Sequence, residues 1–271
     1  MKRKLGVNVQ ERFYIGETDQ LKMIKDAGFD SFFTMMLRED TPEKMYGIAD
    51  TAAKLGLCYE TIHAPFGGAN DLWEDGEDGA EFYGEMTDRI DACQSLGVPV
   101  CIMHVTVTNE APPESELGLN RFRSLAEYAY KKNVKLAFEN LEIPKHLDMV
   151  LSEIKEYHGF CWDIGHNNCY TPETDMMSLY SDRLICTHIH DNIGVTGDGI
   201  TYLDDLHLLP FDGTIDWQKQ MNKIKDARFD GTLMLELSKI KKQDGRYEAL
   251  SMEDYLAEAF TRAQRLCEMC E

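Results

Sequence analysis

The feature that most constrains the fold is a strict alternation of short apolar runs with longer amphipathic stretches along all 271 residues. The apolar runs expected to form strands are Leu5–Val9, Asp30–Met35, Leu57–His63, Val98–Val105, Val134–Glu139, Phe160–Ile164, Leu184–His190 and Thr232–Leu237. The expected helices lie near residues 17–27, 42–55, 79–95, 119–132, 146–157, 172–181, 214–227 and 251–270. Such alternation is typical of βα units around a parallel sheet. Because there are eight of each, we predict a single α/β domain over residues 1–271, closed as a (β/α)8 or TIM barrel.

Signals at the element boundaries agree with this pattern. Left-handed helix C-caps are expected at Gly28, Gly56, Gly97 and Gly231. Helix starts are expected at Thr41-Pro42, at Thr171-Pro172 and over residues 214–216. The sequence has no G-x-G-x-x-G turn and no Walker motif, which argues against dinucleotide and P-loop nucleotide sites.

The charge balance restricts the partners. The chain carries 28 Lys and Arg against 48 Asp and Glu, a formal net charge of −20, so a nucleic-acid partner is not expected. The basic start MKRKLGVNVQ is not followed by an apolar run, and no segment is typical of a membrane span, so we expect a cytoplasmic protein. The eight cysteines are expected to be reduced, with Cys267 and Cys270 as ordinary helix residues and not a zinc site.

Metal-capable residues gather at one end of the expected strands. They are His63, His104, Glu139, Asp163, His188 and Glu236, each at or near the C-terminal end of a different strand. Catalytic residues of this fold come from that rim. Strand periodicity places the large apolar side chains of these strands toward the helices and Glu139, Asp163 and Glu236 toward the barrel interior. Buried acids need a positive partner, and a metal ion is the simplest one.

Local motifs extend the set beyond the strands. Histidines and acids recur in Asp163-x-x-His166, His188-x-His190-Asp191 and Asp205-x-His207, and His63-Ala-Pro-Phe66 adds a rigid turn. Mixed imidazole and carboxylate ligands suit Zn²⁺, Mn²⁺, Co²⁺ or Fe²⁺ better than an all-oxygen calcium site. His190 shares a strand face with His188, but we expect it to support the ligands instead of binding metal.

With these motifs in this order, the chain resembles the xylose isomerase-like barrels, which include sugar isomerases, ketose 3-epimerases and abasic-site nucleases of the endonuclease IV type. The resemblance rests on HAPF at 63–66, His104, Glu139-Asn140, the Asp163, His188 and Asp205 motifs, and Glu236. In the sugar enzymes it implies one metal, held by Glu139, Asp163, His188 and Glu236, with His166 on a substrate oxygen. In the nucleases it implies three zinc ions, with His63, His104, His166, Asp205 and His207 as further ligands.

The favoured hypothesis is a sugar isomerase or epimerase that depends on a divalent metal, Mn²⁺, Zn²⁺, Co²⁺ or Mg²⁺. Glu139 and Glu236 would move a proton through a metal-bound enediolate, with His166 orienting the substrate. Asn140 and Phe66 are expected to contact a small sugar or sugar-like substrate. The alternatives are a multinuclear zinc phosphodiesterase and a barrel that binds metal or sugar without catalysis. Barrels of this type often pair, so a homodimer is compatible with the sequence.

Three features stand outside the pattern. His146 and His158 bracket an expected helix, and we expect both on its surface. The acidic run 73–79 is expected to form a solvated loop, and Trp73 or Phe66 is a candidate to close over the mouth.

Overall fold

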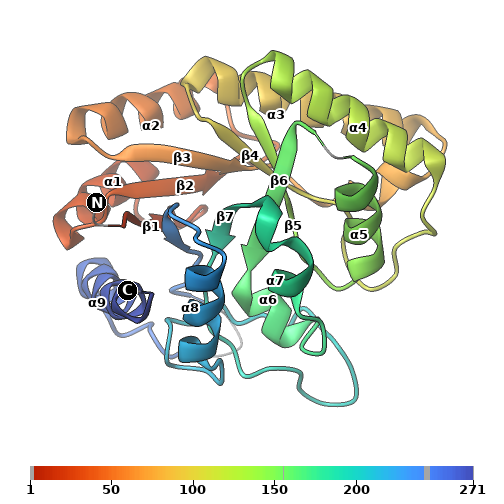
Figure 1. The fold of residues 1–271 in the computed structure, drawn as a ribbon. Coiled ribbons are helices and arrows are strands. Elements are labelled where there is room, and N and C mark those ends of the chain that lie inside the picture. The colour runs from red at the N-terminus through yellow and green to blue at the C-terminus, as the bar shows by residue number, and fades with distance from the viewer. Residues whose placement is uncertain (1–2, 155, 241–244, 271) are drawn as a thin grey trace.

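The computed structural model describes residues 3–154, 156–240 and 245–270, and it confirms the predicted (β/α)8 barrel (Figure 1). The strands are β1 (Leu5–Asn8), β2 (Ser31–Met35), β3 (Cys58–His63), β4 (Val100–His104), β5 (Lys135–Glu139), β6 (His158–Asp163), β7 (Leu184–His188) and β8 (Leu233–Leu235). The helices are α1 (Glu17–Ala27), α2 (Pro42–Leu55), α3 (Glu77–Leu96), α4 (Glu116–Lys131), α5 (Pro144–Glu153), α6 (Ile164–Cys169), α7 (Met176–Tyr180), α8 (Trp217–Asp226) and α9 (Met252–Met269), with 3₁₀ turns η1 (Ala69–Trp73) and η2 (Ser181–Arg183).

All paired strands are parallel, in the order β7-β6-β5-β4-β3-β2-β1-β8. The sheet closes between β7 and β8 through a bridge between Ile189 and Leu235. Ile189 donates its N–H to the carbonyl of Met234 at 2.9 Å and accepts from the N–H of Glu236 at 3.0 Å. Closure therefore brings the C-terminal ends of all strands around one mouth.

Helix caps match the sequence at most expected positions. Gly28, Gly56 and Gly97 are left-handed C-caps, with φ values of 108°, 67° and 70°. Gly231 is not a left-handed cap, and this prediction was wrong, because Arg228 takes the left-handed turn after α8 with φ 53°. The side chain of Thr41 caps α2.

The helix start predicted at Thr171-Pro172 was also wrong. Helix α7 begins later, with Asp175 as its cap, since the carboxylate of Asp175 accepts from the N–H of Ser178. The segments η1, α6 and η2 were not predicted, because helices this short show no apolar periodicity. The predicted helix 146–157 is α5, which ends at Glu153, and residue 155 lies outside the described part of the chain.

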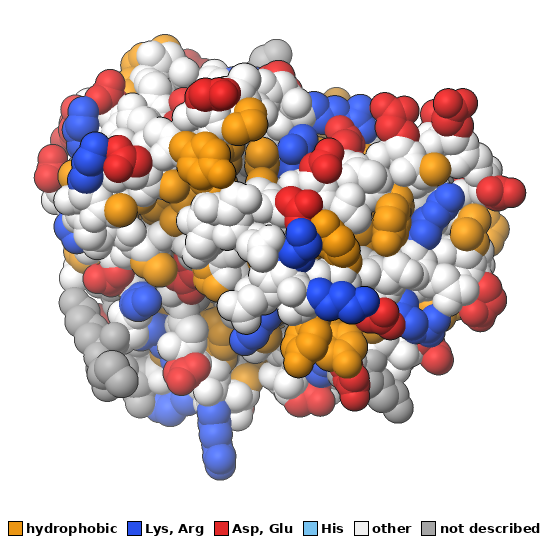
Figure 2. Space-filling view, turned by 90° about the horizontal axis from the view of Figure 1, so that it is seen from above, with side chains coloured by type: hydrophobic (Ala, Val, Ile, Leu, Met, Phe, Trp, Pro, Cys, Tyr) orange, Lys and Arg blue, Asp and Glu red, His pale blue; other side chains and the backbone are white. Residues whose placement is uncertain are grey.

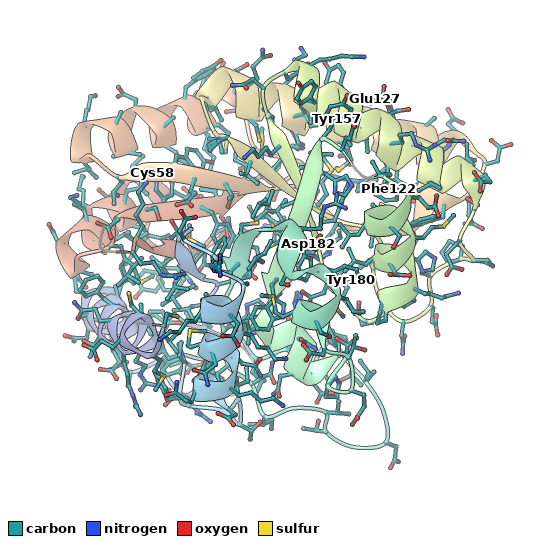
Figure 3. The ribbon with its side chains drawn as sticks, in the orientation of Figure 1. Cys58, Phe122, Glu127, Tyr157, Tyr180 and Asp182 are labelled. Carbon is teal, nitrogen blue, oxygen red and sulfur yellow. The ribbon has the colours of Figure 1, made fainter. Side chains whose placement is uncertain are left out.

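Two apolar layers separate according to strand alternation. Phe138 of β5 faces outward and packs edge-on against Phe122 of α4, with ring centroids 5.6 Å apart. Tyr180 of α7 covers Phe160 in the same way. Figure 3 labels the two covering residues, Phe122 and Tyr180. The inner face carries smaller residues, and its buried cluster is Val100, Ile102, Ala137, Cys161 and Cys186. The barrel floor is thus packed, and the polar strand ends lie above it.

The cysteines of the strands and their neighbouring helices, Cys58, Cys93, Cys101, Cys161, Cys169 and Cys186, are free thiols. Within the described residues, the structure contains no helix with the length and apolarity needed to cross a membrane.

Candidate metal centre

The predicted site residues converge at the barrel mouth. A cavity of about 420 Å³ opens there, lined by Met35, His63, Phe66, His104, Val107, Thr108, Glu139, Leu141, Glu142, His166, Tyr170, Tyr202, Asp205, His207 and Glu236. Asp163 and His188 lie next to it, fully buried. The strand ends therefore bring together acids and imidazoles that are distant in the sequence.

The central group consists of Glu139, Asp163, His188 and Glu236, with one donor atom from each residue within 4.8 Å of the others. Nδ1 of His188 lies 2.8 Å from Oε1 of Glu139 and 3.0 Å from Oε2 of Glu236. The carboxylate of Asp163 approaches the same nitrogen at 4.0 Å. Three carboxylates thus surround one imidazole nitrogen.

Asn140 and Asp163 hold the ends of β5 and β6 in place. The side-chain amide of Asn140 donates to the carbonyl of Asp163 at 2.8 Å and accepts from its N–H at 2.9 Å. Oδ1 of Asp163 accepts from the N–H of His166 at 2.6 Å and so caps α6. These bonds orient Asp163 so that its other oxygen, Oδ2, is directed at the central group.

The electrostatics of this group fit a bound cation. Burial alone would raise the pKa of Glu139, but His188 and hydrogen bonds from His104 hold it well below its ordinary value. Burial opposes protonation of His188, yet Glu236 and Glu139 raise its pKa well above the usual range. Oδ2 of Asp163, the oxygen directed at this group, is buried and lacks a hydrogen-bond partner within the described structure. A divalent ion would satisfy this donor set, since oxygen-rich sites with one imidazole suit Mn²⁺, Co²⁺, Mg²⁺ or Zn²⁺.

A second group shares Glu139. Nε2 of His63 and Nε2 of His104 each lie 3.1 Å from Oε2 of Glu139, and 3.1 Å from one another. Nδ1 of His63 donates to the carbonyl of Ala64 at 2.7 Å, which leaves its Nε2 as an acceptor directed at the cavity. This hydrogen bond fixes the tautomer that a metal-binding or substrate-binding imidazole needs.

A third group contains His166, His190, Asp205 and His207, again with donor atoms within 4.8 Å of one another. From its sequence position we expected His190 to support the ligands instead of binding metal, but its buried ring lies within this group. The available signal was the strand period of two, which puts His188 and His190 on the same inward face.

Two predictions about residues around the mouth were wrong. His146 is fully buried and its Nε2 lies 2.8 Å from the carbonyl of Pro112. Trp73 is also buried, packs edge-on against His146 at 4.8 Å, and donates to the carbonyl of Val105, so it is not a flap.

In the acidic run only residues 74–76 form an exposed turn, because α3 begins at Glu77. His158 is partly buried, and Phe66 does lie in the cavity wall, stacked on His104 at 4.6 Å.

Loop residues complete the site in ways the sequence did not indicate. Glu142, Tyr170 and Tyr202 line the cavity, although they belong to no recognisable motif. Asp191 is buried and accepts from the indole of Trp217 at 2.9 Å and from the N–H of Phe211 at 3.0 Å. Asp191 therefore anchors the loop before α8.

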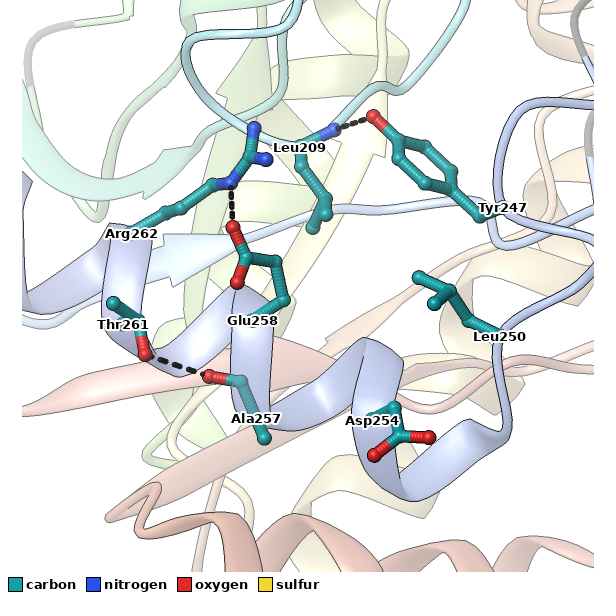
Figure 4. A pocket seen from close by; sticks show the side chains of 8 residues that line it. All are labelled: Leu209, Tyr247, Leu250, Asp254, Ala257, Glu258, Thr261 and Arg262. Atoms are coloured by element: carbon teal, nitrogen blue, oxygen red, sulfur yellow. Dashed lines mark hydrogen bonds and ion pairs between the residues drawn. The ribbon is translucent and has the colours of Figure 1, made fainter.

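A larger cavity of about 510 Å³ lies beside α9, away from the strand ends (Figure 4). Its arginine, Arg262, is held by Asp212 at 2.6 Å and by Glu258 at 2.8 Å. The charge of Arg262 is therefore neutralised, and none of the described residues that line this cavity has a buried polar side-chain atom without a hydrogen-bond partner.

The visible surface agrees with the charge of the sequence. Figure 2 shows acidic and basic side chains interspersed over the face above α2 and α3, without a continuous basic stripe on that face. With a net charge of −20, this surface does not favour a nucleic-acid backbone.

Fold and site together define a (β/α)8 barrel with a metal-capable cluster at the C-terminal ends of its strands. The model of the family described as xylose isomerase-like TIM barrel matches residues 21–259. The chain therefore belongs to the xylose isomerase-like TIM barrel family.

Relatives and structures support the same fold. The uncharacterized protein y4fM of Sinorhizobium fredii is 29% identical over 302 residues, covering 96% of this chain and 91% of that protein. The D-psicose 3-epimerase of Clostridium cellulolyticum H10, solved with D-tagatose, superposes with a TM-score of 0.75 at 14% identity, covering 99% of both chains. The 3-keto-D-glucoside 4-epimerase YcjR of E. coli gives 0.74 at 15% identity, covering 97% of this chain and 100% of that one.

Proposed function

We propose that this protein is a divalent-metal-dependent isomerase or epimerase of a small sugar. The observation that carries the proposal is that Glu139 of β5 and Glu236, just after β8, face one cavity from different sides and converge on His188. Two carboxylates placed in this way provide one group to remove a proton and one to return it.

Each residue of the site has a separate role in the proposed reaction. A divalent ion in the central group would supply Lewis-acid polarisation of a carbonyl and its neighbouring hydroxyl, which would acidify the C–H bond of the carbon that carries this hydroxyl. His188 favours the ionised form of Glu139 and Glu236, so an oxygen of either one can accept that proton. The other carboxylate takes up a proton from solvent between turnovers and delivers it to the opposite face of the substrate. His166 and His63 orient substrate hydroxyl groups from the cavity wall.

The residues of the cavity wall favour an uncharged sugar as the substrate. None of the described residues that line the cavity is Lys or Arg, so the wall offers no basic side chain to a phosphate group. Phe66, Tyr170 and Tyr202 offer apolar faces for the C–H surface of a sugar, and Glu142 offers an acceptor for a hydroxyl. The sugar epimerases among the structural neighbours support this substrate class.

A multinuclear zinc phosphodiesterase is the second candidate. The three donor groups around Glu139 and Asp205 favour it, because nuclease members of the resembled family would use such sites. The net charge and the absence of Lys and Arg from the described cavity lining argue for the sugar substrate instead.

The test is deuterium incorporation from D₂O into a panel of ketoses and aldoses, with Mn²⁺-loaded protein. We expect label beside the carbonyl of at least one sugar, and its loss in Glu139→Gln and Glu236→Gln. Cleavage of abasic-site DNA without label in any sugar would replace this proposal with the phosphodiesterase.

A further inference from the structure

We propose that Cys267, Cys270 and Met221 form a binding site for a soft monovalent ion, Cu⁺, between the helices α8 and α9. The site shares no residue with the metal-capable groups or the cavity of the barrel mouth. It does not depend on the sugar reaction proposed above.

The two cysteines lie on one face of the last turn of α9. They are three residues apart in helical backbone, so their side chains are neighbours on the helix surface. That face continues the buried stripe of the helix, which carries Ala259, Ala263 and Leu266. Both thiols are therefore directed into the protein, where Cys267 is 7% and Cys270 is 8% exposed.

Helix α8 supplies the third sulfur. It packs against α9 (Figure 1), and its residue Met221 is fully buried. The thiol of Cys270 donates to the thioether Sδ of Met221, with the two sulfurs 3.4 Å apart. The thiol proton thus lies between two sulfurs, which is the position that a soft cation would take.

The donor set selects the metal. Thiolate and thioether sulfurs are soft ligands, which favour Cu⁺ over harder divalent ions, and three sulfurs are one fewer than the four ligands of a structural zinc site. Metal–sulfur bonds are about 2.3 Å long, so two sulfurs on one three-coordinate ion lie about 4 Å apart. The sulfurs of Cys270 and Met221 would separate by about half an ångström, a shift that the flexible methionine side chain permits.

Binding has two measurable consequences. The ion displaces both thiol protons, so two protons are released for each Cu⁺ bound, without a change of oxidation state. The ion would also link α8 to α9, and the bound protein should therefore resist unfolding more than the metal-free protein. A cation is favoured at this turn, because the backbone dipole of a helix is negative at its C-terminal end.

The experiment titrates Cu⁺ into reduced, metal-free protein under nitrogen, in competition with the copper chelator bicinchoninate. We expect the wild type to withdraw one more equivalent of Cu⁺ than Cys270→Ser, whose affinity should be more than about 100-fold weaker. Met221→Leu keeps the side-chain volume and should weaken binding by about 10-fold. Cys58→Ser is the matched control and should bind as the wild type does, because Cys58 is a partly buried thiol on β3 and belongs to neither helix.

X-ray absorption at the copper edge separates this site from the histidines of the barrel mouth. We expect only sulfur neighbours around the ion, at about 2.3 Å, and a higher urea midpoint of unfolding for the copper-bound protein. Equal copper uptake by the wild type, Cys270→Ser and Met221→Leu, or nitrogen neighbours around the ion, would overturn the proposal. If Cys270→Ser does not fold, Met221→Leu makes the same comparison alone. Neither result would affect the deuterium test of the proposed reaction.

Discussion

The replacement Gly165→Ala tests the packing on which the imidazole cluster depends. The new Cβ would lie 2.0, 2.3 and 2.4 Å from three atoms of the His190 ring, far inside van der Waals contact. The ring has little room to move, because it is fully buried, stacks on His207 and contacts Asp163 at 3.2 Å. Overpacking of this kind costs about 1–3 kcal/mol. We therefore expect the free energy of unfolding to fall by about that amount in urea titrations of metal-free protein.

Gly47→Ala is the matched control. Gly47 also lies within a helix, α2, but a Cβ there has no heavy atom within 4 Å. Since glycine in a helix interior costs about 0.5–1 kcal/mol relative to alanine, this variant should be more stable than the wild type. If Gly165→Ala also gained stability, the close packing of His190 against Gly165 would be refuted.

Three further variants change the loop anchor Asp191, the partly buried acid Glu11 and Tyr202 at the cavity mouth. Asp191→Ala should lower the free energy of unfolding by about 2–5 kcal/mol in urea titrations, because it leaves the indole of Trp217 and three backbone N–H groups without their acceptor. A change below about 0.5 kcal/mol would contradict this role. Burial raises the pKa of Glu11 from 4.5 to about 8. The protonated carboxyl therefore contributes fully to the free energy of unfolding below pH 4.5, and this contribution is lost as the pH rises toward 8. Glu11→Gln should therefore gain about 1–3 kcal/mol on the wild type between pH 5 and 9 in metal-free protein, and an equal pH profile for both proteins would contradict the shift. Tyr202→Ala should raise KM for the sugar more than it lowers kcat. The free energy of unfolding should change by less than about 0.5 kcal/mol, because Tyr202 is 73% exposed. Unchanged steady-state kinetics would exclude Tyr202 from the site.

The sequence predicted the barrel because its signals are local. Strand runs and helix stripes have different apolar periods, and the helix boundaries of α1 and α2 carry caps that act within a few residues. The expectation failed at Gly231 because a left-handed turn does not require glycine, and Arg228 adopts it instead. Short segments such as α6 were missed because six residues are too few to show a period.

The acids and histidines at the strand ends were predictable for a related reason. Parallel strands carry their C-terminal ends to one rim, so position along a strand is enough to assign a residue to the mouth. The contact of Trp73 with His146 was not predictable, because it joins η1 to α5 through packing that leaves no local pattern. Strand alternation placed His190 on the inward face, but the close approach of its ring to Gly165 at the start of α6 has no local pattern in the sequence.

The most direct test of the central claim is an anomalous-scattering map, at the manganese edge, from crystals of metal-free protein soaked in Mn²⁺. The account predicts a peak about 2.0–2.2 Å from oxygens of Glu139, Asp163 and Glu236 and from a ring nitrogen of His188. A map with no peak among these four residues, in crystals that retain the fold, would contradict a metal centre at the barrel mouth.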